Sequence, residues 1–156
     1  MNKPLRSAHL IFDLNGVLFE KKQGLTQTIY LPITPCIEIL KECAQLRNTN
    51  NKPLHKLYVL SNASTFSLAA LQNQFPDIFA LFKGIHISSI VGLSKPDQGF
   101  FRYFLNAHKL DASECIFIDD ALVNVEAGES IGITGILYIT AQNLRQILQI
   151  LDILPH

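Results

Sequence analysis

The sequence predicts an α/β fold in which a mainly parallel sheet of five strands lies between two layers of helices. Short apolar runs, typical of strands buried on both faces, alternate with stretches of helical period along all 156 residues. Strands that alternate with helices pair in parallel, with right-handed crossovers that place helices on both faces. Apolar residues make up 48% of the chain, which is enough for one buried core and argues against disorder. We therefore expect residues 1–156 to form a single domain.

The first predicted strand is an apolar run that ends abruptly in a carboxylate. Residues 8–12 form this strand, Asp13 follows it, and Gly16 allows a tight turn whose backbone amides face Asp13. Open parallel sheets bind ligands at this end of their strands. An ordinary aspartate that caps a loop explains this stretch slightly better when the stretch is taken alone, so the argument depends on the strands that follow.

The remaining elements follow in chain order. Alternation over residues 26–31 predicts a short hairpin or flap, and Thr34 and Pro35 are expected as the cap and first turn of a helix. Later strands are expected at 57–60, 85–88, 115–118 and 136–139, and helices at 64–74, after Asp97, through 123–127 and from Thr140 to Leu151.

The composition of the chain excludes some classes of function. Thirteen basic and thirteen acidic side chains give no net charge, which argues against general nucleic-acid binding. No run approaches the roughly 18 apolar residues of a membrane span, and the start of the chain is too short and polar for a secretory signal. Cys36, Cys43 and Cys115 fall within predicted helices and strands and are interpreted as reduced, buried thiols. We expect a cytoplasmic protein.

Polar residues follow four of the predicted strands. They are Asp13 and Asn15, Ser61 and Asn62, Lys95, and Asp119 and Asp120. Parallel strands bring these residues to one edge of the sheet, where converging carboxylates repel one another unless a cation lies between them. Oxygen ligands with room for water suit Mg²⁺. Lys95, Ser61 and exposed amides beside the metal would suit a phosphoryl group.

Four short motifs in this order resemble the haloacid dehalogenase (HAD) superfamily. They occupy residues 12–18, 60–62, 92–97 and 117–120, with Asn124 and Gly128 behind the last one. Each motif is weak alone, but all four fall at predicted strand ends or in the loops after them and together cover nearly the whole chain. The resemblance implies a HAD-like Rossmannoid three-layer α/β/α sandwich and a Mg²⁺-dependent hydrolase, with a phosphatase favoured.

The resemblance also implies the metal ligands. Asp119 would bind Mg²⁺ directly, Asp120 directly or through water, and Asn15 through its backbone carbonyl, beside Asp13. Asn124 would lie behind these ligands and orient them.

The catalytic and substrate-binding roles follow in the same way. Asp13 would be the nucleophile and carry the phosphoryl group as an aspartyl-phosphate. Ser61, with Asn62 beside it, would bind the phosphoryl oxygens, and Lys95 would neutralise charge on both Asp13 and the phosphate.

Asn15 departs from the pattern of the family's phosphatases, which usually carry an acid/base aspartate two residues after the nucleophile. An amide can hydrogen-bond the leaving oxygen but cannot exchange a proton near neutral pH. Losing such a catalyst typically costs ~10²–10⁴-fold in rate. Three outcomes stay open: the enzyme cleaves esters with good leaving groups; His9, His86 or a substrate hydroxyl supplies the proton; or the fold binds phosphate and metal with little turnover.

Family members often insert a cap domain between these motifs, but the stretches between Asp13, Ser61 and Lys95 hold only the predicted flap, helices and strands. We expect no cap and an open site for a phosphorylated small molecule, or for an exposed phosphate on a larger substrate, unless a homo-oligomer covers it. The alternative is a catalytically impaired phosphate-binding or scaffold protein. Carbon–halogen cleavage is disfavoured, because the family's dehalogenases dispense with Mg²⁺ whereas Asp119 and Asp120 suit a metal.

Overall fold

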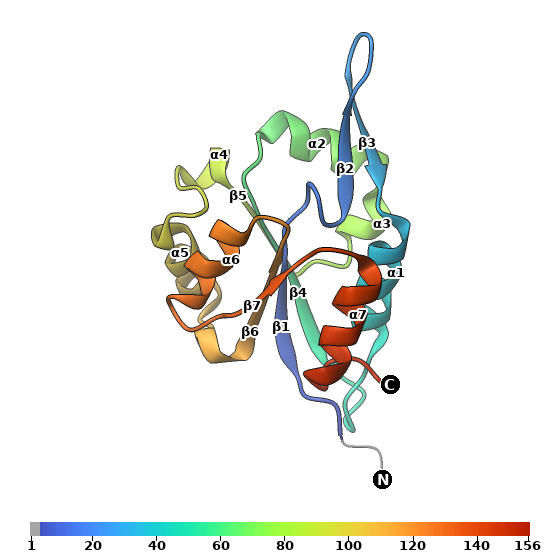
Figure 1. Ribbon diagram of the computed structural model, residues 1–156, viewed down its shortest axis with the longest axis vertical. Helices are drawn as coiled ribbons and strands as arrows, with labels where there is room; N and C mark the ends of the chain where they lie inside the picture. Colours follow the sequence, from blue (N-terminus) through green and yellow to red (C-terminus); the bar gives the residue numbers. More distant parts are fainter. Residues whose placement is uncertain (1–3) are drawn as a thin grey trace.

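The five predicted apolar runs form one parallel sheet in the order β5–β4–β1–β6–β7 (Figure 1). The computed structural model describes residues 4–156. The strands are β1 (Ala8–Phe12), β4 (His55–Ser61), β5 (Gly84–Ile87), β6 (Cys115–Asp119) and β7 (Thr134–Leu137). All four neighbouring pairs are parallel.

Helices cover both faces of this sheet, so the predicted three-layer fold is confirmed. On one face pack α1 (Thr34–Gln45), α2 (Thr65–Gln74), α3 (Pro76–Phe79) and α7 (Ala141–Ile150). On the other pack α5 (Gln98–His108), α6 (Leu122–Glu129) and the short α4 (Ser88–Val91), with one 3₁₀ turn at Ala112–Glu114.

The strands are apolar on both faces because each face has its own helical layer. In β1, Leu10 and Phe12 pack in the core beneath α1 and α7, whereas Ile11 packs with Phe104 of α5. Successive strand side chains point to opposite faces, so a strand between two helical layers needs a continuous apolar run. The alternative of a half-buried, alternating strand does not fit this sequence.

The order of the strands places the end of β1 at a crevice. The chain runs from β1 to β4 and β5 on one side and then to β6 and β7 on the other. The connections therefore leave the ends of β1 and β6 in opposite directions, which opens the crevice where such sheets bind ligands. Asp13 and Asp119, at the ends of these two strands, both lie there.

The predicted flap is a two-stranded antiparallel hairpin that is longer than expected. Strand β2 (Phe19–Gln23) pairs with β3 (Thr28–Pro32) and the hairpin projects beyond the sheet edge (Figure 1). It is held at its base because Phe19 and Tyr30 are buried in the core.

Several predicted boundaries differ from the structure by one or two residues, among them the start of the first helix and the end of β7. Thr34 lies inside α1, and Ile33 is the N-cap without any side-chain cap. The amide of Ile33 donates to Leu18 O at 2.8 Å and its side chain packs on the core, so the helix starts directly after β3. Strand β7 ends at Leu137 and not at residue 139.

The three cysteines are buried and free, as predicted, and burial raises the pKa of each thiol to about 12. Such thiols pack as small apolar groups. Within residues 4–156, the helices all lack the length and apolar character that a membrane crossing requires.

The packing of α7 gives a test of the fold. Leu148 is fully buried, so Leu148→Ala should lower the free energy of unfolding by about 2–5 kcal/mol, because it removes apolar contacts and leaves a cavity. Gln146→Ala on the exposed side of the same helix should change it by less than about 0.5 kcal/mol. Urea unfolding of both variants measures the difference, and equal effects would contradict the packing described here.

Candidate active site

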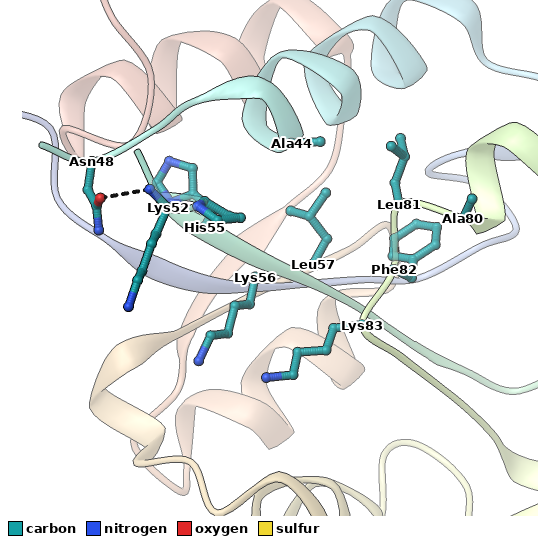
Figure 2. A pocket seen from close by; sticks show the side chains of 11 residues that line it. Ala44, Asn48, Lys52, His55, Lys56, Leu57, Ala80, Leu81, Phe82 and Lys83 are labelled. Carbon is teal, nitrogen blue, oxygen red and sulfur yellow. Dashed lines mark hydrogen bonds between the residues drawn. The ribbon is translucent and has the colours of Figure 1, made fainter. Parts of the chain in front are cut away.

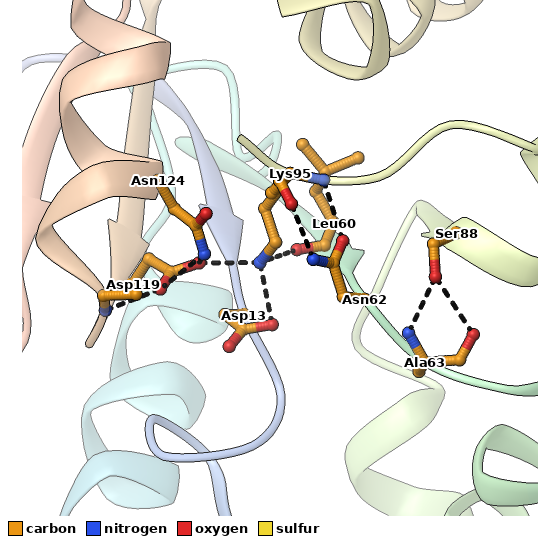
Figure 3. A network of polar contacts seen from close by, with 9 residues as sticks. Asp13, Leu60, Asn62, Ala63, Ser88, Lys95, Asp119 and Asn124 are labelled. Atoms are coloured by element: carbon orange, nitrogen blue, oxygen red, sulfur yellow. Dashed lines mark hydrogen bonds and ion pairs between the residues drawn. The ribbon is translucent and has the colours of Figure 1, made fainter. Parts of the chain in front are cut away.

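The centre of the site is the buried ammonium group of Lys95, which lies between two carboxylates (Figure 3). Its Nζ is 2.9 Å from Asp13 Oδ1 and 2.6 Å from Asp119 Oδ2, and it donates to the carbonyl oxygen of Leu60 at 2.9 Å. Only 4% of Lys95 is exposed, and the ammonium lies 5.3 Å from the centre of the Phe117 ring. An ammonium has three hydrogens to donate, so these three acceptors use all of them.

Lys95 is held in place by the side chain of Asn62. The Asn62 amide donates to Lys95 O at 2.9 Å and its oxygen accepts from Lys95 N at 2.8 Å. Nearby, the hydroxyl of Ser88 at the start of α4 accepts a hydrogen bond from the amide of Ala63 and donates one to its carbonyl oxygen (Figure 3). The second and third motifs are therefore joined directly, and Asn62 fixes the backbone of Lys95. The prediction that Asn62 also binds substrate stays a prediction.

Asp119 is fully buried and is oriented from two sides. Its Oδ1 accepts from the amide of Ala121 at 2.8 Å, and the Asn124 side chain donates to both carboxylate oxygens at 3.2–3.3 Å. Asn124 thus lies behind Asp119, as the sequence predicted.

The turn after β1 approaches the acidic pair closely. Gly16 has φ +83°, and a Cβ there would collide with the carboxylate of Asp120. Any other residue at position 16 would be strained and would displace Asp120. Gly16 therefore allows the turn to lie against the acidic group.

The three carboxylates could hold a divalent cation. One oxygen each from Asp13, Asp119 and Asp120 lies within 4.8 Å of the other two. Ligand oxygens around Mg²⁺ lie at about 2.1 Å from the ion, hence roughly 3–4 Å from one another, so small side-chain shifts suffice. Three ionised carboxylates and one ammonium would sum to a net charge of −2, which a divalent cation would balance.

Burial and the nearness of the three carboxyl groups raise the pKa values of two of them. Burial raises the pKa of Asp13 above its usual 3.8, opposed by the charge of Lys95 and by a hydrogen bond from Ser61, while the carboxylate of Asp119 raises it further. Burial also raises the pKa of Asp120, and the charges of Asp119 and Asp13 add to this effect. A cation bound between these groups would favour their ionised forms.

Asn15 lies in the same turn and has an unsatisfied oxygen. Its side-chain Oδ1 is buried and has no hydrogen-bond partner within residues 4–156. A buried acceptor without a hydrogen-bond partner is uncommon in a folded protein. A donor on a ligand, or a water molecule, would satisfy it.

The histidines named as proton donors lie elsewhere. His9 is at the start of β1, four residues or roughly 13 Å along the strand from Asp13. His86 Nε2 lies 2.8 Å from His108 Nε2 and its ring packs against Tyr103 and Phe104 of α5. His9 is therefore remote from Asp13, and the His86 ring is held against α5.

A separate cavity lies away from this site. It has a volume of about 700 Å³ and lies at the amino ends of β4 and β5, with Lys52, Lys56 and Lys83 around apolar side chains such as Leu57 and Phe82 (Figure 2). The predicted catalytic residues meet at the opposite edge of the sheet.

The family assignment follows from fold, site and similarity together. A sequence model of haloacid dehalogenase-like hydrolases matches residues 31–132, which include Ser61, Lys95 and the Asp119–Asp120 pair. The chain belongs to this family of hydrolases.

Sequence relatives resemble parts of the chain. It is 35% identical over 83 residues to a drimenol cyclase of Aspergillus calidoustus, which covers 53% of this chain and 16% of that protein. It is 41% identical over 56 residues to a sesquiterpene phosphatase of Aspergillus oryzae, which covers 36% of this chain and 29% of that protein. The matched segments therefore span less than a third of either relative.

Solved structures share the whole fold. A hydrolase from Streptococcus pneumoniae TIGR4 superposes with a TM-score of 0.71 at 16% identity, covering 93% of this chain and 100% of that one. A HAD family enzyme from Bacteroides thetaiotaomicron, in complex with magnesium and inorganic phosphate, has a TM-score of 0.61 at 16% identity, covering 83% and 93%.

Magnesium should stabilise the protein in a pH-dependent way. Protons compete with Mg²⁺ for Asp13 and Asp120, whose pKa values are raised. Ionisation of either carboxyl group carries a cost in the folded state, and bound Mg²⁺ would offset that cost. At 100 times its Kd, the ion should raise Tm by about 5–10 °C. The shift should vanish as pH falls through the raised pKa values.

Thermal unfolding with and without Mg²⁺ from pH 4 to 8 measures this shift. Asp120→Asn should reduce the shift, whereas Asp77→Asn, an exposed acidic residue outside the site, should leave it unchanged. A shift that is the same at every pH would argue against a carboxylate site.

Proposed function

We propose that the chain is a Mg²⁺-dependent phosphatase that works through an aspartyl-phosphate on Asp13. The observation that carries this proposal is the buried Lys95 ammonium between Asp13 and Asp119, with an oxygen of Asp120 within 4.8 Å. The similarity to a sesquiterpene phosphatase over 56 residues supports phosphate chemistry. So does the related fold of an enzyme bound to magnesium and inorganic phosphate.

The chain's own residues supply a nucleophile and charge stabilisation. A carboxylate oxygen of Asp13 attacks the phosphorus atom, a P–O bond to Asp13 forms, and the bond to the leaving oxygen breaks. Bound Mg²⁺ between Asp13, Asp119 and Asp120 would offset the charge of the phosphoryl oxygens. Water then attacks the phosphorus, which releases inorganic phosphate and restores the carboxylate.

For Lys95 to donate a hydrogen bond to a phosphoryl group, it has to give up one of its three present hydrogen bonds. All three hydrogens of its ammonium are directed at Asp13, Asp119 and Leu60 O. Asp13 and Asp119 would hold the cation, and a carboxylate that turned toward it would leave one hydrogen of Lys95 for the phosphate. We therefore expect metal to bind before substrate.

Asn15 makes the departure of the leaving group the difficult step. The leaving oxygen needs a proton, and the Asn15 amide can donate only a hydrogen bond to it. Good leaving groups, such as acyl phosphates or aryl esters, do not need this proton. We propose that such substrates are hydrolysed and that alkyl esters react slowly.

We also propose that the site works without a cap domain. Between Asp13 and Ser61 the chain forms only the β2–β3 hairpin, α1 and β4, and between Ser61 and Lys95 only α2, α3, β5 and α4. An uncovered site accepts a phosphorylated small molecule or an exposed phosphate on a larger one. A homo-oligomer that covers the edge is the other possibility.

A second function is favoured by Asn15 alone. If no group replaces the missing acid, the intact metal and phosphate ligands make a phosphate-binding or regulatory protein. This function predicts binding of phosphate with Mg²⁺ but no metal-dependent turnover.

The phosphatase proposal is tested with p-nitrophenyl phosphate and a panel of phosphorylated metabolites. The wild type should release phosphate only with Mg²⁺, and Asp13→Asn should reduce turnover to the background rate because its amide is not a nucleophile. Asp77→Asn, which changes an exposed aspartate of α3 outside the four motifs, is the matched control and should stay active. Metal-independent turnover, or an active Asp13→Asn variant, would refute the mechanism.

Asn15→Asp tests the role of the missing acid. The substitution adds the proton-exchanging carboxyl group at this position, so kcat for alkyl phosphates should rise by about 10²–10⁴-fold. The gain should be much smaller for p-nitrophenyl phosphate, whose leaving group needs no proton. Initial rates with both substrates measure the ratio, and an unchanged ratio would mean that Asn15 does not limit the reaction.

A further inference from the structure

Exposed apolar side chains are concentrated at the edge of the sheet that holds the candidate active site. Ten large apolar residues are exposed within residues 4–156, and eight of them lie in the β2–β3 hairpin or within five residues after the end of a parallel strand. Single exposed apolar residues are normal and would be scattered over the surface. Their gathering on one edge points to a function there.

The most exposed members of this group follow all five parallel strands. Each is more than half exposed, and they come from the hairpin tip, α2, α4, α6 and the turn after β7. We call them the apolar rim: Leu25, Phe66, Ile90, Leu122, Val123 and Ile139.

Rim residues sit next to residues that are bonded within the site. Leu122 follows Ala121, whose amide donates to Asp119, and Phe66 follows Asn62, which is bonded to Lys95, by four residues. Ile90 is in α4, which Ser88 ties to Ala63. The rim therefore belongs to the same rigid connections that position the phosphate and metal ligands.

The rim extends across the full width of the sheet. Neighbouring strands lie about 4.8 Å apart, so five strands span roughly 20 Å. Figure 1 shows the hairpin, α2 and α4 around the same edge. Apolar area of this extent, around a polar centre, matches a molecule with a charged head and a long apolar body.

We propose that the apolar rim binds the hydrocarbon chain of a phosphoester whose phosphoryl group lies at Asp13. This rests on the proposed function and names its substrate class, the phosphate esters of long apolar alcohols. A sugar phosphate would leave these apolar side chains in water. A chain laid over the rim covers them, and it excludes water from the otherwise open site.

Binding of n-alkylphosphonates, from ethyl to octyl, tests the proposal without requiring turnover. Titration calorimetry with Mg²⁺ should show Kd falling with each added methylene group, by up to about fourfold per group, until the rim is filled. The double variant Phe66→Ser with Leu122→Ser should flatten this dependence. Ile150→Ser, which changes a residue 75% exposed at the end of α7, is the matched control and should leave it unchanged.

The outcomes separate this inference from the function on which it rests. A Kd that does not depend on chain length overturns the rim proposal, even if p-nitrophenyl phosphate is hydrolysed. A chain-length dependence without hydrolysis of any alkyl or aryl phosphate supports the rim and overturns the phosphatase. If the double variant dissociates a dimer in sedimentation and chain length has no effect, the rim is a protein interface and the proposal is wrong.

Discussion

The site depends on one constraint, the buried ammonium of Lys95 held between Asp13 and Asp119. Removing three charges from water is costly, and their attraction offsets that cost only when every hydrogen of the ammonium has an acceptor. Leu60 O supplies the third acceptor and Asn62 fixes the backbone from which the side chain extends. The ends of three strands and the loop that carries Lys95 must therefore keep their relative positions.

The sheet order makes this arrangement possible. Because β4 and β6 flank β1 on opposite sides, Leu60, Asp13 and Asp119 lie on three adjacent strands, and Lys95 reaches all three from the loop after α4. The parallel register pairs Phe12 with both Val59 and Ile118, one residue before these site residues. The same pairing that closes the core thus fixes the spacing of the polar groups.

Much of this could be predicted from the sequence, because the signals are local. Apolar runs that end in Asp13, Ser61 and Asp119 give both the strands and the edge where they meet. The contact of Lys95 with the carbonyl of Leu60 could not be predicted, because every residue has a backbone carbonyl. The exact start of a helix could not be predicted either, because neighbouring residues compete for the cap position. Thr34 is a good cap by type, but the hydrogen bond of Ile33 to Leu18 moves the start of α1 ahead of it.

The cost of having Asn15 in place of an acid depends on how easily water reaches the site. A missing proton donor is least harmful where solvent can reach the leaving oxygen, and a site without a cap domain, as proposed above, would allow this. The same access would expose the proposed aspartyl-phosphate to water, so its hydrolysis would depend less strictly on an aligned base than in a closed site. A bound apolar chain would shield the site while the substrate is present and reopen it when the alcohol leaves. The chain's departure, and not a moving domain, would then admit the water that completes the reaction.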